Sequence, residues 1–382
     1  MRVTLIADGA TASPVDAAGE AEHETSMTPP HVLRVLLLAL GCIIYPTIMT
    51  AASGITYPAQ SGPGGGRHLV FLTGDEEYRS EEGLPMLAKI LSQRHGFKCT
   101  VLFALDPDGT VNPDNNRSVP GIEALDQADG IVMMLRFRQW PDAAMKHFEA
   151  AVVRGVPIVA LRTSTHAFLF PPNSPGAYTR YNNFGREVLG ENWVSHWGPN
   201  RRGATRGIVE PGAEADPLLR GVSGIFGDSG VYETHPVPDA KILLRGQALK
   251  GMSPTDEPDT YLRTRRSDNQ NQGVNSPAMA VAWIRQNRNP NGKTNRVFCT
   301  TMGAATDLAN EGLRRLVVNA VLWGFEIDVP TKTDVRFVDP YAPTDYSFKG
   351  YRRGVTPADH ALGRELRAGT TPPPSAAPLR KP

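Results

Sequence analysis

The chain has 382 residues, 40% of them hydrophobic, and a formal net charge of +1, with 40 Lys and Arg against 39 Asp and Glu. This length is enough to bury the core of one large domain or of two modest ones. A nucleic-acid-binding surface normally needs clustered basic residues, and no basic block stands out, so the composition argues against a dedicated nucleic-acid interface.

Residues 1–53 are predicted to form an N-terminal leader with a signal peptide. Arg34 precedes an apolar run over 35–49, which small residues follow. This order is typical of a secretory signal peptide. The run has about 15 residues, whereas a spanning helix needs about 20, so a single-pass anchor is the minor alternative. Because residues 1–26 are acidic, we expect translation to start at Met27, and the protein to be periplasmic or secreted.

A Gly- and Pro-rich spacer over 54–66 precedes the main domain, predicted over 67–328. Short apolar runs predict strands buried on both faces, at HLVFLT, CTVLF, GIVMML and VPIVAL. Further strands are expected at YETHP, KILLRG, AMAVAWIR and RVFCTTM. Apolar periodicity predicts helices over 84–95, over 141–154 and around 308–323.

This alternation of strands and helices predicts an α/β fold with a mostly parallel, doubly wound sheet. The segment 168–230 lacks a strong period and is expected to form a loop layer over one edge of the sheet. Residues 329–368 are predicted to form an irregular extension that packs on the domain. The Pro-rich residues 369–382 are expected to be a disordered tail.

Two cysteines remain once the leader is removed, Cys99 and Cys299, and each lies in a predicted strand. A single pair on separate strands is not a disulfide framework. We therefore expect both to be buried thiols.

Polar side chains collect where the predicted strands end, and ligands of open parallel sheets bind beyond the carboxyl ends of the strands. The first strand is followed by Asp75, Glu76, Glu77 and Tyr78, the third by Arg136 and Arg138, and the fourth by Arg162, Thr163, Ser164, Thr165 and His166. Later segments add His196, Trp197, Asn200, Arg201, Tyr232, Glu233, His235, Thr301 and Gly303.

The catalytic candidates among these are His166, Glu77, His235 and Arg162. Imidazole titrates near neutral pH, so His166 would be the general acid or base, with Glu77 or His235 as its proton-transfer partner. Arg162 and Arg138 would stabilise negative charge developing on a carbonyl or hydroxyl oxygen. The candidates for substrate binding are Glu76, Tyr78, Arg138, Ser164, His196, Trp197, Asn200 and Tyr232.

Each candidate also has a purely structural interpretation. Acidic residues ahead of a helix, such as Glu81 and Glu82, are favoured by the helix dipole. Thr163 or Ser164 can cap the turn that follows. Three of the nine histidines fall in the predicted rim loops, which favours a functional role for them.

No cofactor is predicted. The sequence has no HExxH, no GxGxxG after the first strand and no GxxxxGK[ST], which argues against a zincin, a Rossmann-type cofactor and a P-loop. A divalent metal held by His166, His196, His235 and Glu77 is a weaker alternative.

Aromatic residues and asparagines share the insertion, with Trp193 and Trp197 close to Tyr178 and Tyr181. The flat apolar faces of aromatic side chains, next to amide groups, can bind a sugar ring with its many hydroxyl groups. The alternative is that these aromatics pack the insertion onto the domain.

Four blocks of the sequence resemble the secreted bacterial branch of the ThuA-like, trehalose-utilisation family: VFLTGDEEYRSEEGLPMLAKIL, ALRTSTHAF, GVYETHPVPDAKILLRG and NRVFCTTMGAATDLANEGLRRLVVNAVLWGFE. The resemblance covers about residues 67–328. It implies a class I glutamine amidotransferase-like fold, a flavodoxin-like three-layer α/β/α sandwich. It also implies a link to carbohydrate metabolism, with a hydrolase label in some members.

In the amidotransferase relatives, the turn after the corresponding strand carries a nucleophilic cysteine. Here ALRTSTHAF places Arg162 or Thr163 at that position, and neither Cys99 nor Cys299 lies in this turn. Thiolate chemistry through a Cys–His pair is therefore excluded. ThuA-like proteins generally lack this cysteine too.

Two functions follow. The first is a hydrolase-like or isomerase-like enzyme that acts on a sugar or keto-sugar by His and carboxylate acid–base chemistry. The second is a non-catalytic carbohydrate-binding module. Both take a small carbohydrate as partner, and neither requires nucleic acid or stable membrane insertion after cleavage of the signal peptide. The oligomeric state is left open.

Overall fold

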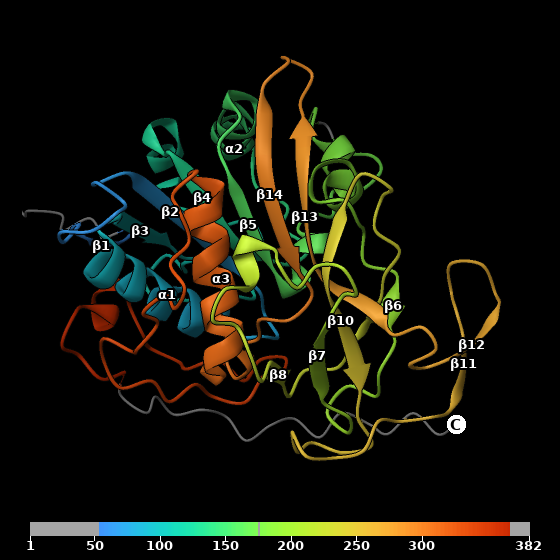
Figure 1. The fold of residues 1–382 in the computed structure, drawn as a ribbon. Helices are drawn as coiled ribbons and strands as arrows, with labels where there is room; N and C mark the ends of the chain where they lie inside the picture. The colour runs from blue at the N-terminus through green and yellow to red at the C-terminus, as the bar shows by residue number, and fades with distance from the viewer. Residues whose placement is uncertain (1–52, 175, 367–382) are drawn as a thin grey trace, which may run out of the picture. The chain divides into compact units, whose positions relative to one another are not determined.

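The computed structural model describes residues 53–174 and 176–366 (Figure 1). The predicted signal peptide with its start at Met27, the alternative membrane anchor and the predicted tail over 369–382 lie outside the described residues. Within the described ranges, no helix combines the length and apolar character needed to cross a membrane.

Five parallel strands form the core of the sheet. In spatial order they are β3 (Lys98–Leu102), β2 (His68–Gly74), β4 (Gly130–Leu135), β5 (Ile158–Leu161) and β14 (Thr294–Thr300). The second strand in sequence therefore lies outside the first, which is the order of flavodoxin-like sheets. In such sheets the ligand site lies where neighbouring strands lead their connections to opposite faces, here between β2 and β4.

Five antiparallel strands complete the ten-stranded sheet, so it is mixed rather than mostly parallel. Beyond β14 lie β13 (Met279–Arg288), β10 (Lys241–Ala248), β7 (Thr205–Val209) and β8 (Phe226–Gly227), and β1 (Gly54–Tyr57) pairs with β3 at the other edge. A short loop joins β13 to β14, closed by the bond from Asn289 N to Lys293 O at 2.8 Å. A connection this short permits only antiparallel pairing. Residues 54–57, predicted to belong to a spacer, are a strand.

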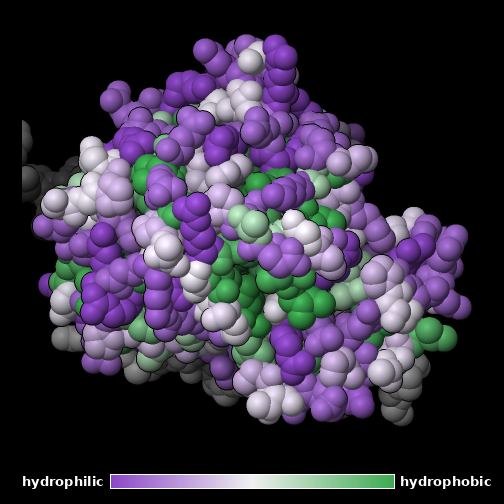
Figure 2. All heavy atoms as spheres, in the orientation of Figure 1, coloured by the Kyte–Doolittle hydropathy of each residue, from purple (hydrophilic) through white to green (hydrophobic). Residues whose placement is uncertain are grey.

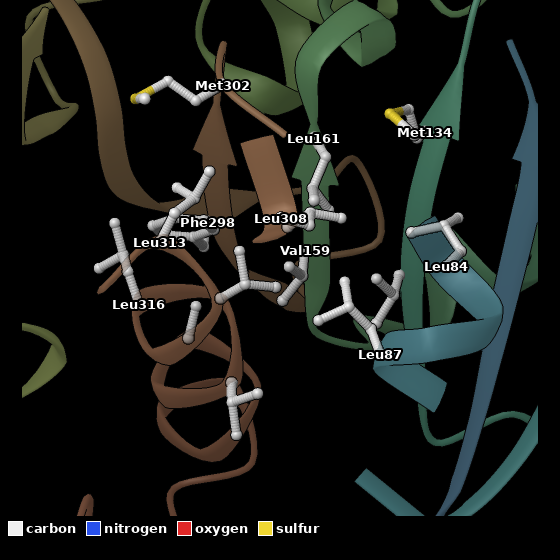
Figure 3. Packing of buried hydrophobic residues seen from close by; sticks show 14 of the residues in the cluster. Leu84, Leu87, Met134, Val159, Leu161, Phe298, Met302, Leu308, Leu313 and Leu316 are labelled. Atoms are coloured by element: carbon white, nitrogen blue, oxygen red, sulfur yellow. The ribbon is translucent and has the colours of Figure 1, made fainter. Parts of the chain in front are cut away.

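Helices cover both faces of the parallel core. One face carries α1 (Ser80–His95) and α3 (Glu311–Gly324), and the other carries α2 (Asp142–Arg154) with the short helix η1 (Ile122–Gln127). Figure 3 shows leucines of α1 and α3 converging on Val159 and Leu161 of β5. The intervening Ile158 and Ala160 pack on the α2 side, as expected for alternating side chains of a strand buried on both faces. The predicted three-layer α/β/α arrangement is confirmed.

The insertion after β5 contains short elements rather than a plain loop layer. They are the helices η2 (Arg162–His166), η3 (Thr179–Asn183), η4 (Gly185–Leu189) and η5 (Pro217–Leu219), and the strand pair β6 (Ser195–His196) and β9 (Tyr232–Glu233). A hairpin of β11 (Leu262–Thr264) and β12 (Asn271–Gly273) follows β10. Tyr181 packs on Phe148, Phe168 and Phe184, so it anchors the insertion on α2.

The short helix η6 (Asp307–Ala309) precedes α3. The residues after α3 run along α1 and include the short helix η7 (Pro357–His360) near their end. Lys89 of α1 forms an ion pair with Asp339 at 2.5 Å, and the hydroxyl of Tyr57 donates to the carbonyl oxygen of His360 at 2.7 Å. Figure 2 shows a largely hydrophilic face, with apolar residues gathered between α3 and β10. Cys99 and Cys299 are buried free thiols, as predicted.

Candidate functional site

Asp75 organises the turn that follows β2. Its Oδ1 accepts hydrogen bonds from the backbone N–H groups of Glu77 at 2.7 Å and Tyr78 at 2.8 Å, and its Oδ2 accepts the hydroxyl of Thr163. Thr163 therefore ties the turn after β5 to the turn after β2 instead of capping its own helix. Asp75 is fully buried, so these bonds fix the direction in which the neighbouring acids point.

Arg162 occupies the sharp turn at the end of β5, with a left-handed φ of 45°. In other α/β enzymes a strained strand-to-helix turn of this kind presents the nucleophile. Here the buried guanidinium donates to the carbonyl oxygens of Gly230 at 2.9 Å and Thr301 at 2.6 Å, and to the hydroxyl of Tyr78 at 3.1 Å. Its carbon atom also lies 4.0 Å from the ring centre of Tyr232. Arg162 therefore stands where such enzymes carry the nucleophile, and its hydrogen bonds hold the turn in place.

Two predicted binding residues have their polar atoms committed to the protein. The hydroxyl of Ser164 donates to Met133 O at 3.1 Å and accepts from Leu135 N at 3.3 Å, so it braces β4. The buried Arg138 donates to Pro113 O at 3.0 Å and to Glu76 at 2.9 Å. Both side chains therefore have a structural role, and their role in substrate binding stays a prediction.

The side chains of two further candidates, Trp197 and His235, are engaged elsewhere. Trp197 is buried in the hydrophobic core, and its Nε1 donates to Val274 O at 2.8 Å. The ring of His235 lies 3.4 Å from Glu233 and 3.1 Å from the hydroxyl of Ser267. Neither residue joins the group of side chains around Glu77 and His166.

Glu76 is paired, whereas Glu77 is not. Glu76 accepts bonds from the guanidinium groups of Arg136 and Arg138. The buried carboxylate of Glu77 has no side-chain hydrogen bond within the described part of the chain. Burial, and then the nearby charge of Asp75, raise the pKa of Glu77 to about 7. Glu77 is therefore poised to exchange a proton near neutral pH.

Two histidines and two larger aromatic residues form a ring cluster, and one of them, Tyr232, interacts electrostatically with Glu77. The rings of His166 and Trp193 are 5.1 Å apart, those of His196 and Tyr232 are 5.2 Å apart, and those of Trp193 and Tyr232 are 6.3 Å apart. The pairing of β6 with β9 sets His196 opposite Tyr232. The turn after β5 supplies His166.

Both imidazoles of this group are held neutral. Burial, and then the charge of Arg136, hold the pKa of His166 well below its usual value. Burial, and then Arg162, lower the pKa of His196 to about 3. At neutral pH each ring is therefore uncharged, with one N–H donor and one acceptor nitrogen, and Nδ1 of His166 lies 3.3 Å from the hydroxyl of Thr165. The carboxyl of Glu77 is therefore the group whose pKa lies near neutral pH, whereas the pKa values of both histidines are lowered.

Asn200 and Tyr78 hold the wall of the site. Asn200 donates to the hydroxyl of Tyr78 at 3.3 Å and accepts from Gly230 N at 3.1 Å and from the hydroxyl of Tyr346 at 3.3 Å. The ring of Tyr78 lies 5.0 Å from that of Tyr346. Both residues lie at the site, and their polar atoms form the hydrogen bonds that hold it in position.

The side chains of the described residues form no group of three or more His, Cys, Asp or Glu able to hold a metal ion. The alternative metal site at His166, His196, His235 and Glu77 is therefore not assembled, and the ring of His235 lies beside Glu233 instead. Arg136, whose charge acts on Glu77, and Trp193, which packs on His166, are not among the predicted site residues. Arg136 directly follows a predicted strand, and Trp193 belongs to the aromatic residues of the insertion, so the sequence held a signal for both.

No known protein-family model matches the sequence, and no curated protein matches it. The fold is similar to those of several solved structures. A ThuA-like protein from Bacteroides uniformis is 15% identical and matches over 71% of this chain and 96% of its own, with a TM-score of 0.43. A ThuA-like protein from Parabacteroides merdae is 14% identical over 74% and 97%, with a TM-score of 0.38. PurLQS from Thermotoga maritima is 12% identical over 67% and 98%, with a TM-score of 0.33.

Proposed function

We propose that the protein is an enzyme that transfers a proton to or from a sugar or keto-sugar, with Glu77 as the general acid or base. The observation that carries this proposal is the environment of Glu77, a buried carboxyl without a hydrogen-bond partner among the described residues whose pKa is raised to about 7. A general acid or base works best when its pKa lies near the working pH.

The neighbouring groups supply the rest of the chemistry. Arg136 acts electrostatically on Glu77, and it would stabilise negative charge developing on a substrate oxygen. The neutral rings of His166 and His196 would donate hydrogen bonds to hydroxyl or carbonyl oxygens and accept them from hydroxyl groups. His235, the other predicted proton-transfer partner, has no place in this scheme.

A carbohydrate is the substrate class that these groups suit. A sugar presents many hydroxyl groups and an apolar ring face, and the site offers uncharged imidazoles beside the rings of Trp193 and Tyr232. The resemblance of the four sequence blocks to the ThuA-like family implies the same class. The predicted leader would direct this activity to the periplasm or the medium.

A non-catalytic carbohydrate-binding module is the second candidate, and the turn after β5 favours it. Arg162 stands at the nucleophile position, and the hydroxyls of Thr163 and Ser164 are committed to Asp75 and to β4. Arg162, Thr163 and Ser164 therefore offer no free nucleophile. A site that has lost its chemistry would still bind its sugar.

A proton NMR time course on the purified full chain separates these candidates. Trehalose, other disaccharides and their keto derivatives are incubated with the wild type, Glu77→Gln and Glu123→Gln, with divalent metal and again with chelator. Glu123 is an exposed carboxylate on η1 and is the matched control. Product from the wild type and Glu123→Gln, but not from Glu77→Gln, supports the enzyme. Ligand line broadening without product supports the binding module. The absence of both product and line broadening rejects carbohydrates as the ligand class.

A further inference from the structure

The C-terminal extension brings the ring of Phe348 next to Arg136. The ring centre of Phe348 lies 5.0 Å from the guanidinium carbon of Arg136, and Phe137 lies 4.6 Å away from the same group. The charge of Arg136 acts on both Glu77 and His166, so this guanidinium belongs to the site. An aromatic ring that stacks on it therefore lies at the edge of the site.

The chain on the N-terminal side of Phe348 is firmly held. The ring of Tyr346 packs on that of Tyr78 at 5.0 Å, and its hydroxyl donates to Asn200 at 3.3 Å. The carbonyl oxygen of Ser347 accepts from the buried Arg79 at 2.5 Å. These contacts position the extension against the walls of the site.

The side chain of Phe348 nevertheless remains 51% exposed. It is one of few large hydrophobic residues that are exposed to this degree in the described residues. An exposed aromatic ring held in a fixed place beside a polar site has the form of a platform for a ligand. Its contact with Arg136 leaves part of the ring open to solvent.

We propose that Phe348 is the stacking platform for the sugar ring, so that the C-terminal extension is part of the binding site. The C–H groups on one face of a sugar ring are apolar and pack on an aromatic face, while its hydroxyl groups reach Glu77 and the two histidines. This inference rests on the proposed function and adds a specificity-determining residue to it.

Binding of trehalose, sucrose, cellobiose and D-glucose to the full chain tests the proposal, by calorimetry and by saturation-transfer NMR. We expect Phe348→Ala to weaken binding of the sugar that the wild type prefers by about three- to tenfold. Phe348→Tyr keeps the ring face and should stay within about twofold of the wild type. Leu262→Ala, at a 74% exposed leucine of the β11–β12 hairpin, is the matched control and should change nothing.

Equal affinities of the wild type and Phe348→Ala would overturn this inference and leave the proposed function intact. Equal losses in Phe348→Ala and Phe348→Tyr would also overturn it, because the ring face would then not be what the sugar needs. A wild type that binds none of the four sugars would overturn the proposed function and this inference together. Thermal unfolding of each variant checks that the fold is unchanged.

Discussion

The guanidinium carbon of Arg162 lies 4.0 Å from the ring centre of Tyr232, so the turn after β5 is joined to β9 by a buried cation. The left-handed backbone of Arg162 costs of order 1–3 kcal/mol, and its bonds to the carbonyl oxygens of Gly230 and Thr301 offset this cost. In this protein the turn is a structural junction of the parallel core with the insertion.

Replacing Arg162 with methionine should therefore destabilise the fold. The substitution leaves the carbonyl oxygens of Gly230 and Thr301 without this donor, which costs about 3 kcal/mol, while the hydroxyl of Tyr78 keeps the bond from Asn200. Urea unfolding followed by circular dichroism measures the loss. Arg117→Met, at an exposed arginine, is the control and should stay within about 0.5 kcal/mol of the wild type. A stable Arg162→Met would mean that these bonds contribute little.

Glu77 should make the protein less stable as the pH rises. The folded state raises the pKa of this carboxyl from 4.5 to about 7, so the folded protein holds a proton that the unfolded chain releases. The penalty is absent at about pH 4, grows between 4.5 and 7, and reaches about 3 kcal/mol above 7. Glu77→Gln removes it and should be more stable than the wild type at about pH 8 but not at about pH 4.

Urea unfolding at the two pH values checks this expectation, and Glu76→Gln is the contrasting variant. Glu76 is paired with Arg136 and Arg138, so its loss should destabilise the protein at about pH 8. If Glu77→Gln shows no gain at the higher pH, the carboxyl of Glu77 ionises at its ordinary pKa and the proposed acid–base role loses its basis.

His196 should contribute to acid sensitivity in the opposite direction. Burial and the charge of Arg162 lower its pKa from 6.5 to about 3. Between these two pH values the imidazole of His196 binds a proton in the unfolded chain but not in the folded protein. Stability should fall as the pH drops below 6.5, and His196→Gln should reduce this fall. Imidazole carbon NMR on the folded protein provides the direct check. A His196 signal that titrates near 6.5 would contradict the assignment.

Glu82 should anchor the C-terminal extension. Its carboxylate accepts the backbone N–H and the hydroxyl of Thr344, each at 2.7 Å, and Arg352 Nε at 3.2 Å. Glu82→Gln weakens these charge-assisted bonds and should cost about 2 kcal/mol. Amide hydrogen exchange should become faster around residues 344–352, the segment that carries Phe348. Unchanged exchange there would show that other contacts hold the extension in place.

The strands and helices of the core could be predicted because their patterns are local. GIVMML predicts the strand that forms β4, and the helix predicted over 141–154 differs from α2 by a single residue at its start. The first helix begins at Ser80 rather than at residue 84, because Gly83 and Pro85 weaken the signal of its first turn. Pro85 lies inside the helix, in its second turn, where it has no N–H to donate to the preceding turn.

The sequence by itself determined the parallel core and the set of strand ends at which the site lies, since parallel strands bring their carboxyl ends to one edge of a sheet. That is why Glu77, Arg162 and His166 could be named in advance. Only the tertiary structure decided which polar atoms remain available. Ser164 and Trp197 are committed to backbone carbonyl oxygens from distant segments, and Phe348 reaches the site from the C-terminal extension. Burial and non-local partners set these roles and the pKa values of Glu77 and His166, and neither is written in the local pattern of the chain.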